Sequence, residues 1–166
     1  MTDLSLALSP ETPADAPVVE KLAERAFGPG RFARTAYRLR EGVAPDYALS
    51  FVARVGTLVV GANRMTPLRL GDAPALLLGP LIVDPMFRSR GIGRTLIGRS
   101  LDAARAAGHR LVLLVGDAPY YGPLGFKRVP HGRLVMPGPV DPARLLVSEL
   151  VDGAFEGVGG AVAGAR

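Results

Sequence analysis

The sequence predicts an α/β domain built around a buried central strand. Apolar residues alternate with polar ones in some segments and recur at helical spacing in others, so strands and helices share one chain. Residues 75–83 are apolar almost throughout, which is typical of a strand covered on both faces. A glycine-rich turn and a segment with helical periodicity follow this strand directly. The 166 residues suit one domain that can bury a core without disulfide bonds.

The first half of the chain is predicted to form a strand, two helices and a hairpin. Leucines at every second position near the N-terminus indicate a strand. Thr12, a following proline and Asp15 resemble a capping box, so a helix should start here. The predicted elements are a strand at 3–9, helices at about 13–27 and 31–41, hairpin strands at 47–55 and 57–66, and a loop at 67–74.

The second half begins with the central strand, which carries a local conflict. Gly79 and Pro80 lie inside it, and proline cannot donate to a β-ladder, so the strand should bulge or splay there. The predicted elements that follow are a helix at 91–107, strands at 110–115, 126–129 and 144–151, and a loop or short helix at 117–124. We predict a single domain over 1–152. The Gly/Ala-rich residues 153–166 are weakly patterned and have the composition of a mobile tail.

Composition excludes several classes of protein. There is no cysteine, which removes disulfide frameworks, thiolate nucleophiles and Cys-ligated metals, and two histidines are too few for a His-built metal site. The apolar runs are strand-sized rather than membrane-spanning. The N-terminal segment contains acidic residues and lacks the features of a signal peptide. We therefore expect a cytoplasmic protein with no resident metal and no membrane partner.

The net charge of +5 comes from two arginine clusters. Residues 88–110 hold six arginines against one acid, and residues 25–40 hold five against none. A clustered positive field favours an anionic ligand. Nucleic acid is the weaker reading of that charge, because the chain has no Trp and few aromatic residues for a stacking platform.

The turn after the central strand is the strongest candidate site. A helix N-terminus presents free backbone N–H groups and positive partial charge. Gly91 and Gly93 let a ligand approach those amides, and Arg88, Arg90 and Arg94 add full charges. The arrangement suits a phosphate or pyrophosphate group. It is not a P-loop, because the lysine and hydroxyl of that motif are missing.

Two motifs resemble those of the GNAT superfamily of acyl-CoA-dependent N-acetyltransferases, in particular a bacterial subgroup. Arg88, Gly91 and Gly93 match its (Q/R)-x-x-G-x-(G/A) signature, and the segment from Tyr121 to Phe126 matches its Y-x-x-x-G-F pattern. The resemblance extends over most of the chain. It implies a mixed, mostly antiparallel twisted sheet with helices on both faces and a splayed central strand.

The resemblance also implies a function, a cofactor and a set of site residues. The cofactor is acetyl-CoA, whose pyrophosphate is held by the backbone amides of 88–94 and whose pantetheine arm pairs with the splayed strand. A backbone N–H of that strand acts as an oxyanion donor. Tyr121 is the candidate general acid for the departing thiolate, and the amine attacks directly, without a covalent enzyme intermediate. The implied cofactor-binding residues are Leu81, Ile82, Val83, Arg88, Ser89, Arg90, Gly91, Ile92, Gly93 and Arg94.

The general base and the amine acceptor are left open. The central strand carries no carboxylate, so Asp117, His109, Glu41 or a chain of waters are the candidate proton acceptors. Tyr120 is expected to form part of a wall. The acceptor is a small molecule, weakly favoured, or a peptide amine.

We expect the acceptor pocket to be built by residues 27–41 and the C-terminal strands. Within that segment Arg31, Arg34 and Arg38 suggest an acidic acceptor. The oligomeric state also stays open, a homodimer included.

Two other classes of function compete with this interpretation. A regulatory module could hold acyl-CoA without turnover, which the missing carboxylate favours. A nucleic-acid-binding protein is the less favoured alternative, suggested by the pI of about 10.2.

Overall fold

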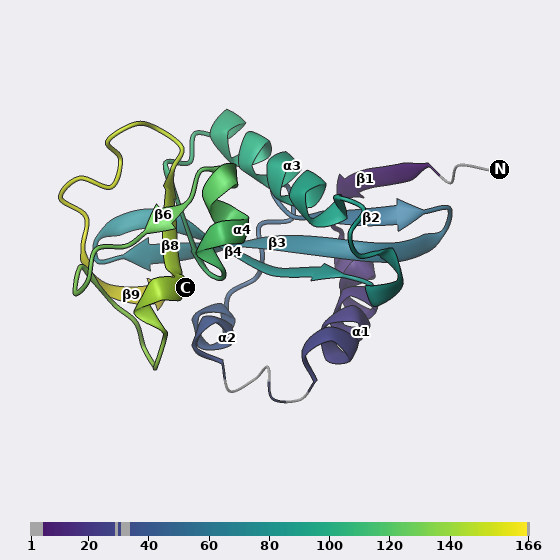
Figure 1. Cartoon of the computed structure of the whole chain (residues 1–166), viewed down its shortest axis with the longest axis horizontal. Coiled ribbons are helices and arrows are strands. Elements are labelled where there is room, and N and C mark those ends of the chain that lie inside the picture. The colour runs from purple at the N-terminus through teal and green to yellow at the C-terminus, as the bar shows by residue number, and fades with distance from the viewer. Residues whose placement is uncertain (1–4, 29, 31–33, 166) are drawn as a thin grey trace.

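In the computed structural model, which describes residues 5–28, 30 and 34–165, one twisted sheet runs through the molecule in the order β1-β2-β3-β4-β5-β8-β6 (Figure 1). Within this order only β4 and β5 are parallel neighbours. The strands are β1 (Leu6–Pro10), β2 (Phe51–Val55), β3 (Leu58–Leu70), β4 (Ala73–Val83), β5 (Leu111–Val115), β6 (Lys127–Arg128), β7 (Leu134–Val135), β8 (Leu145–Glu149) and β9 (Gly160–Gly164). The helices are α1 (Ala16–Phe27), α2 (Thr35–Arg40), α3 (Ile92–Ala106) and α4 (Ala118–Tyr121).

Helices cover both faces of the sheet, as the sequence predicts. Successive residues of a strand point to opposite faces. Phe51 and Ala53 of β2 pack with residues of α3, whereas Val52 between them packs with residues of α1. Figure 1 shows α3 on one side of the strands and α1 with α2 on the other. The predicted fold class is confirmed.

The predicted loop at 67–74 is wrong, because the two central strands continue through it. β3 and β4 pair without interruption from Met65 to the tight turn at Gly71. Leu68 and Leu70 are buried while Arg69 between them is exposed, which is the period-two pattern of a strand. The turn itself needs only Gly71, whose φ of 59° suits glycine.

The expectation that residues 153–166 form a tail outside the domain is also wrong for the residues described. β9 adds to β3 alongside Leu68–Leu70, and the side chains of Phe155 and Val162 are buried. The small residues of β9 allow its backbone to lie close to that of α2. A Cβ at Gly164 would lie 2.6 Å from the carbonyl oxygen of Leu39. Glycine and alanine in this segment therefore permit packing of backbone against backbone.

The predicted splay of the central strand is present. β4 and β5 pair only at Leu76–Val112 and Leu77–Leu113. Immediately afterwards, at Gly79 and Pro80, the register of β4 against β3 shifts. Beyond this bulge β4 stays with β3 and no longer pairs with β5, whose last residues pair with β8 alone, so a cleft opens between β4 and β5 in the middle of the sheet.

No helix in the described part of the chain is long and apolar enough to cross a membrane.

Candidate active site

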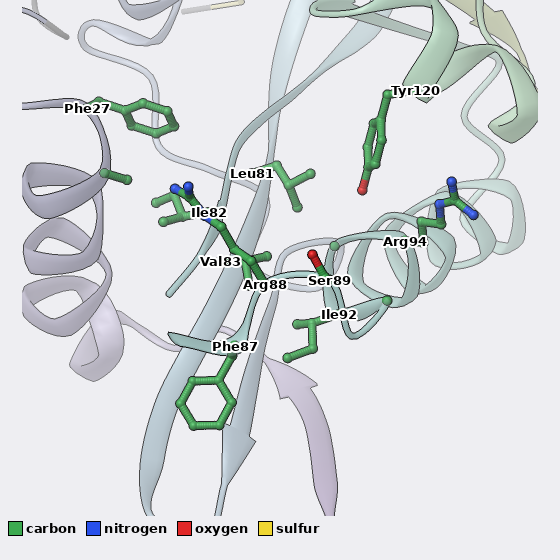
Figure 2. A pocket seen from close by; sticks show the side chains of 13 residues that line it. Phe27, Leu81, Ile82, Val83, Phe87, Arg88, Ser89, Ile92, Arg94 and Tyr120 are labelled. Atoms are coloured by element: carbon green, nitrogen blue, oxygen red, sulfur yellow. The ribbon is translucent and has the colours of Figure 1, made fainter. Parts of the chain in front are cut away.

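A first cavity of about 510 Å³ lies where β4 ends and α3 begins. Figure 2 shows the side chains that surround it. Arg90, which was predicted as a cofactor residue, is not among them; its guanidinium lies 5.4 Å from the centre of the Phe87 ring. The other nine predicted cofactor residues all line the cavity: Leu81, Ile82, Val83, Arg88, Ser89, Gly91, Ile92, Gly93 and Arg94.

The turn before α3 has the backbone geometry of an anion cradle. Gly91 caps the helix in the left-handed region with φ 76°, and Ser89 is held there too, with φ 64°. A non-glycine residue in that region is strained by roughly 1 kcal/mol or more, and such strain concentrates at functional sites. The amide of Thr95 bonds to the carbonyl of Gly91, so the amides before it have no partner within the helix.

The space beside Gly91 is open, whereas Tyr120 lies close to Gly93. A Cβ at Gly91 would meet nothing within 4 Å, whereas a Cβ at Gly93 would lie 2.8 Å from the hydroxyl of Tyr120. In Figure 2 the guanidinium of Arg88 points toward Ile82, and the hydroxyl of Tyr120 points toward the start of α3. Open amides, strained turn residues and a cation fit a phosphate-bearing group.

A second cavity, of about 1030 Å³, opens from the cleft between the splayed strands. Its walls come from α1, α2, the bulge in β4, the end of β5 and α4. The residues that line both cavities are Phe27, Leu81, Arg88 and Tyr120, so the two cavities meet at this point. A ligand held at the cradle can therefore reach toward the second cavity. The expectation that residues 27–41 help to build a pocket agrees with these walls.

Tyr121, the predicted acid, lines the second cavity and not the first. Its ring packs edge-on against Tyr120 at 4.8 Å and Phe126 at 5.9 Å between centroids. Burial and, to a smaller extent, the nearby Tyr120 and Asp117 raise the pKa of Tyr121 to about 12. The hydroxyl is therefore protonated at neutral pH and is available as a hydrogen-bond donor.

Tyr120 contacts more of the candidate site than the sequence predicts, since it was expected only to form part of a wall. It lines both cavities, and the guanidinium of Arg94 lies 5.7 Å from the centre of its ring. The sequence carries no signal that separates the two neighbouring tyrosines beyond the family spacing, which matches Tyr121.

Two of the three candidate side-chain bases lie at the second cavity, and the third does not. Glu41 and Asp117 line the second cavity, whereas His109 does not. Asp117 accepts a hydrogen bond from Arg144 at 2.8 Å. Glu20, a residue that sequence reasoning missed, also lines the cavity and accepts a hydrogen bond from Arg64 at 3.2 Å.

The arginines of the second cavity differ from those predicted for an acidic acceptor. Arg34 lines the cavity, but Arg38 donates to the carbonyl of Pro137 at 3.4 Å, and Arg31 lies outside the described residues. Arg40 and Arg64 line the cavity instead. Neither follows a recognisable motif, so no signal in the sequence could have found them.

Arg64 is held by a buried carboxylate. Glu11, whose side chain is fully buried, accepts hydrogen bonds from both Nε and Nη2 of Arg64 at 3.0–3.2 Å. Burial alone would lower the pKa of Arg64, but the hydrogen bonds and charges of Glu11 and Glu20 raise it. The pair therefore anchors one wall of the cavity as a fixed ion pair.

Replacing Glu11 with glutamine is expected to lower the free energy of unfolding by about 3 kcal/mol, because it leaves the largely buried guanidinium of Arg64 without its buried counter-charge and with only the exposed Glu20. Urea denaturation measures the change. Asp102→Asn is the matched control, since Asp102 and Arg105 form an exposed pair and its loss should change stability by less than about 0.5 kcal/mol. Equal effects of the two substitutions would contradict the anchoring role.

A mixed sheet with a splayed central pair, an anion cradle at the following helix and a cleft beside it define a class of acyltransferase fold. The chain belongs to the Acetyltransferase (GNAT) family, whose sequence profile matches residues 17–126. Over 154 residues it is 30% identical to an uncharacterized N-acetyltransferase of Escherichia coli (strain K12), YhbS, and the match covers 92% of each chain. A second relative from the same strain, the uncharacterized N-acetyltransferase YjhQ, is 32% identical over 118 residues, which cover 69% of this chain and 65% of YjhQ.

Solved structures agree with this assignment. The crystal structure of YhbS from Escherichia coli in complex with CoA superposes with a TM-score of 0.83 and 28% identity, covering 99% of this chain and 92% of that one. A GNAT family acetyltransferase from Brucella melitensis in complex with acetyl-CoA has a TM-score of 0.60 and 29% identity, covering 92% and 99% of the two chains.

Proposed function

We propose that the protein transfers an acetyl group from acetyl-CoA to a primary amine, with the cofactor in the first cavity and the acceptor in the second. The observation that carries the proposal is the junction of the two cavities at Leu81 and Tyr120, beside the open amides at the start of α3. The relatives crystallised with CoA and acetyl-CoA support the choice of cofactor. We also propose that the protein acts in the cytoplasm.

The cradle residues would hold the pyrophosphate of the cofactor. The free amides at the start of α3 supply hydrogen bonds, and Arg88 supplies charge. Residues 81–83 of β4 pair with β3 on one edge and with no neighbouring strand on the other. That free edge can pair with the amide groups of the pantetheine arm in the manner of an added strand.

The bound cofactor supplies an acetyl thioester, which is already activated toward an amine. A backbone N–H of β4 at the cleft can donate to the thioester carbonyl and stabilise the developing oxyanion. A new C–N bond forms as the C–S bond breaks, and the proton from nitrogen passes to a base such as Glu41 or Asp117, directly or through water. There is no cysteine in the chain, so direct attack requires no thiolate on the enzyme.

Tyr121 would act on the leaving group. A phenol of pKa about 12 keeps its proton during the attack, whereas an ordinary thiol has a pKa near 8.5. The hydroxyl therefore stabilises the departing thiolate by hydrogen bonding before any proton is transferred. This role places the effect of Tyr121 in the transition state rather than in cofactor binding.

The test is release of CoA from acetyl-CoA across a panel of primary amines that includes peptides. We expect turnover with some amines, and small molecules among them, because the acceptor cavity has walls on several sides. Thermal stabilisation by CoA without turnover of any amine would instead support the non-catalytic acyl-CoA-binding module, which the absence of a carboxylate from β4 favours.

A further inference from the structure

Arg40, at the end of α2, lines the second cavity beside the bulge of β4. It ends α2 and reaches over the bulge of β4, where its Nη2 lies 2.9 Å from the position that a Cβ at Gly79 would take. Its Nε is buried and has no hydrogen-bond partner. Among the described residues no carboxylate lies within ion-pair distance of Arg40.

A buried guanidinium nitrogen without a hydrogen-bond acceptor is unfavourable for the free protein. Burial and, to a smaller extent, the neighbouring charge of Arg64 lower the pKa of Arg40 to about 10, so the side chain is still cationic at neutral pH. Buried charges in proteins are normally paired and hydrogen-bonded. The carboxylates of Glu11 and Glu20 accept hydrogen bonds from Arg64, and that of Glu41, the residue after Arg40, is exposed.

The rest of the cavity has a similar imbalance of charge. Arg64 and Arg144 are paired with acids, and Arg88 stands at the junction with the cofactor cavity. Among the other described charged residues of the cavity, those left outside the ion pairs are Arg34 and Glu41, which are both exposed, and Arg40, whose Nε is buried. The cavity is thus prepared for one anionic group close to the bulge.

We propose that Arg40 binds a carboxylate of the acceptor, so that the substrate is a small primary amine that also carries a carboxylate group. The inference rests on the proposed acetyl transfer and names its substrate class. The planar guanidinium can donate two parallel hydrogen bonds to a carboxylate. Because Gly79 lies on the same strand as Leu81, a carboxylate at Arg40 would leave the amine of a small molecule near the junction with the cofactor cavity.

Gly79 has a specific part in this arrangement. Its φ of 114° is one that residues with a side chain rarely adopt, and the missing Cβ makes room for the Arg40 guanidinium. The same bulge therefore splays the strand beside the cofactor cavity and seats the cation in the acceptor cavity.

The decisive variant is Arg40→Met, which keeps the length of the side chain and removes its charge and donors. Arg38→Met is the matched control, because Arg38 sits on the same helix and bonds to Pro137. Each protein is assayed with amino acids and with their carboxamides as acceptors at saturating acetyl-CoA. Binding of the same compounds to the CoA-loaded protein is measured by calorimetry, independently of turnover.

We expect the wild type to prefer the acids to the carboxamides. Arg40→Met should lower kcat/KM for the acids by about 100-fold, the loss expected for a buried charged hydrogen bond, and change that for the carboxamides by less than about threefold. The melting temperature without ligand should not fall, because the substitution removes an unpaired buried cation. Arg40→Lys should retain part of the preference, and Arg38→Met all of it.

The outcomes separate the two proposals. Turnover of carboxamides as good as that of acids, or an Arg40→Met variant that keeps the preference, overturns the carboxylate site and leaves acetyl transfer standing. Absence of turnover with every amine overturns the proposed function, and the calorimetric comparison of acid with carboxamide then decides the role of Arg40. Failure of every carboxylate to bind overturns it as well.

Discussion

Replacing Tyr121 with phenylalanine is expected to lower kcat for acetyl transfer by about 100-fold or more, with the dissociation constant of CoA changed by less than about twofold. Tyr121 lines the proposed acceptor cavity, and its hydroxyl keeps its proton, since burial raises the pKa of Tyr121 to about 12. In the proposed reaction it would act on the leaving thiolate and not on the bound phosphates. Steady-state kinetics with acetyl-CoA and an accepted amine, together with calorimetric CoA binding, measure both quantities.

Tyr120→Phe is the matched control for this prediction. Tyr120 is the neighbouring residue, and its ring contacts that of Tyr121. Its hydroxyl lies close to Gly93, which lines the first cavity. We expect kcat to change by less than about threefold in this variant. If Tyr120→Phe loses the activity and Tyr121→Phe keeps it, the two tyrosines have exchanged roles, and the assignment based on family spacing is wrong.

Replacing Gly93 with valine is expected to weaken CoA binding by about 100-fold, equivalent to roughly 2.7 kcal/mol. A Cβ here would stand 2.8 Å from the Tyr120 hydroxyl and 3.6–3.7 Å from Leu81 and Val83, so the side chain fills the cradle and displaces Tyr120. The amides at the start of α3 would then no longer be open to a phosphate. Calorimetric titration with CoA checks the result.

Gly98→Ala provides a control on the same helix. A Cβ at Gly98 meets nothing within 4 Å, so alanine should leave CoA affinity unchanged and stabilise the helix by about 0.5–1 kcal/mol. Gly93→Ala combined with Tyr120→Phe tests the stated cause, because removing the hydroxyl should restore part of the affinity that Gly93→Ala alone loses. Full affinity in Gly93→Val would contradict the location of the cradle.

Local patterns were enough to predict the central elements. The apolar face of α3, with Leu96, Ile97 and Leu101, is buried as its spacing indicates. The bulge at Gly79 and Pro80 follows from the chemistry of those two residues alone. Both are properties of short segments, which is why they can be read without knowledge of the fold.

Strand pairing over long distances could not be predicted in this way. The residues of β9 are too small and weakly patterned to indicate a strand, and they form one because the edge of β3 at Leu68–Leu70 offers free backbone groups. The strand at 67–70 was missed for a related reason: Pro67 reads as a loop residue, but its place is decided by its neighbours on β4 and β9.

The sequence by itself determined the family and the candidate phosphate cradle, because a cradle made of consecutive residues at a helix N-terminus carries its geometry in its own order of glycines and arginines. Only the tertiary structure decided the proposed acceptor site. Arg40 from α2 meets Gly79 of β4, and Arg64 of β3 meets Glu11 after β1, so each pairing joins segments far apart in the chain. These contacts decide which arginine is neutralised by an acid and which can bind a ligand. Counting charges along the sequence cannot show this difference.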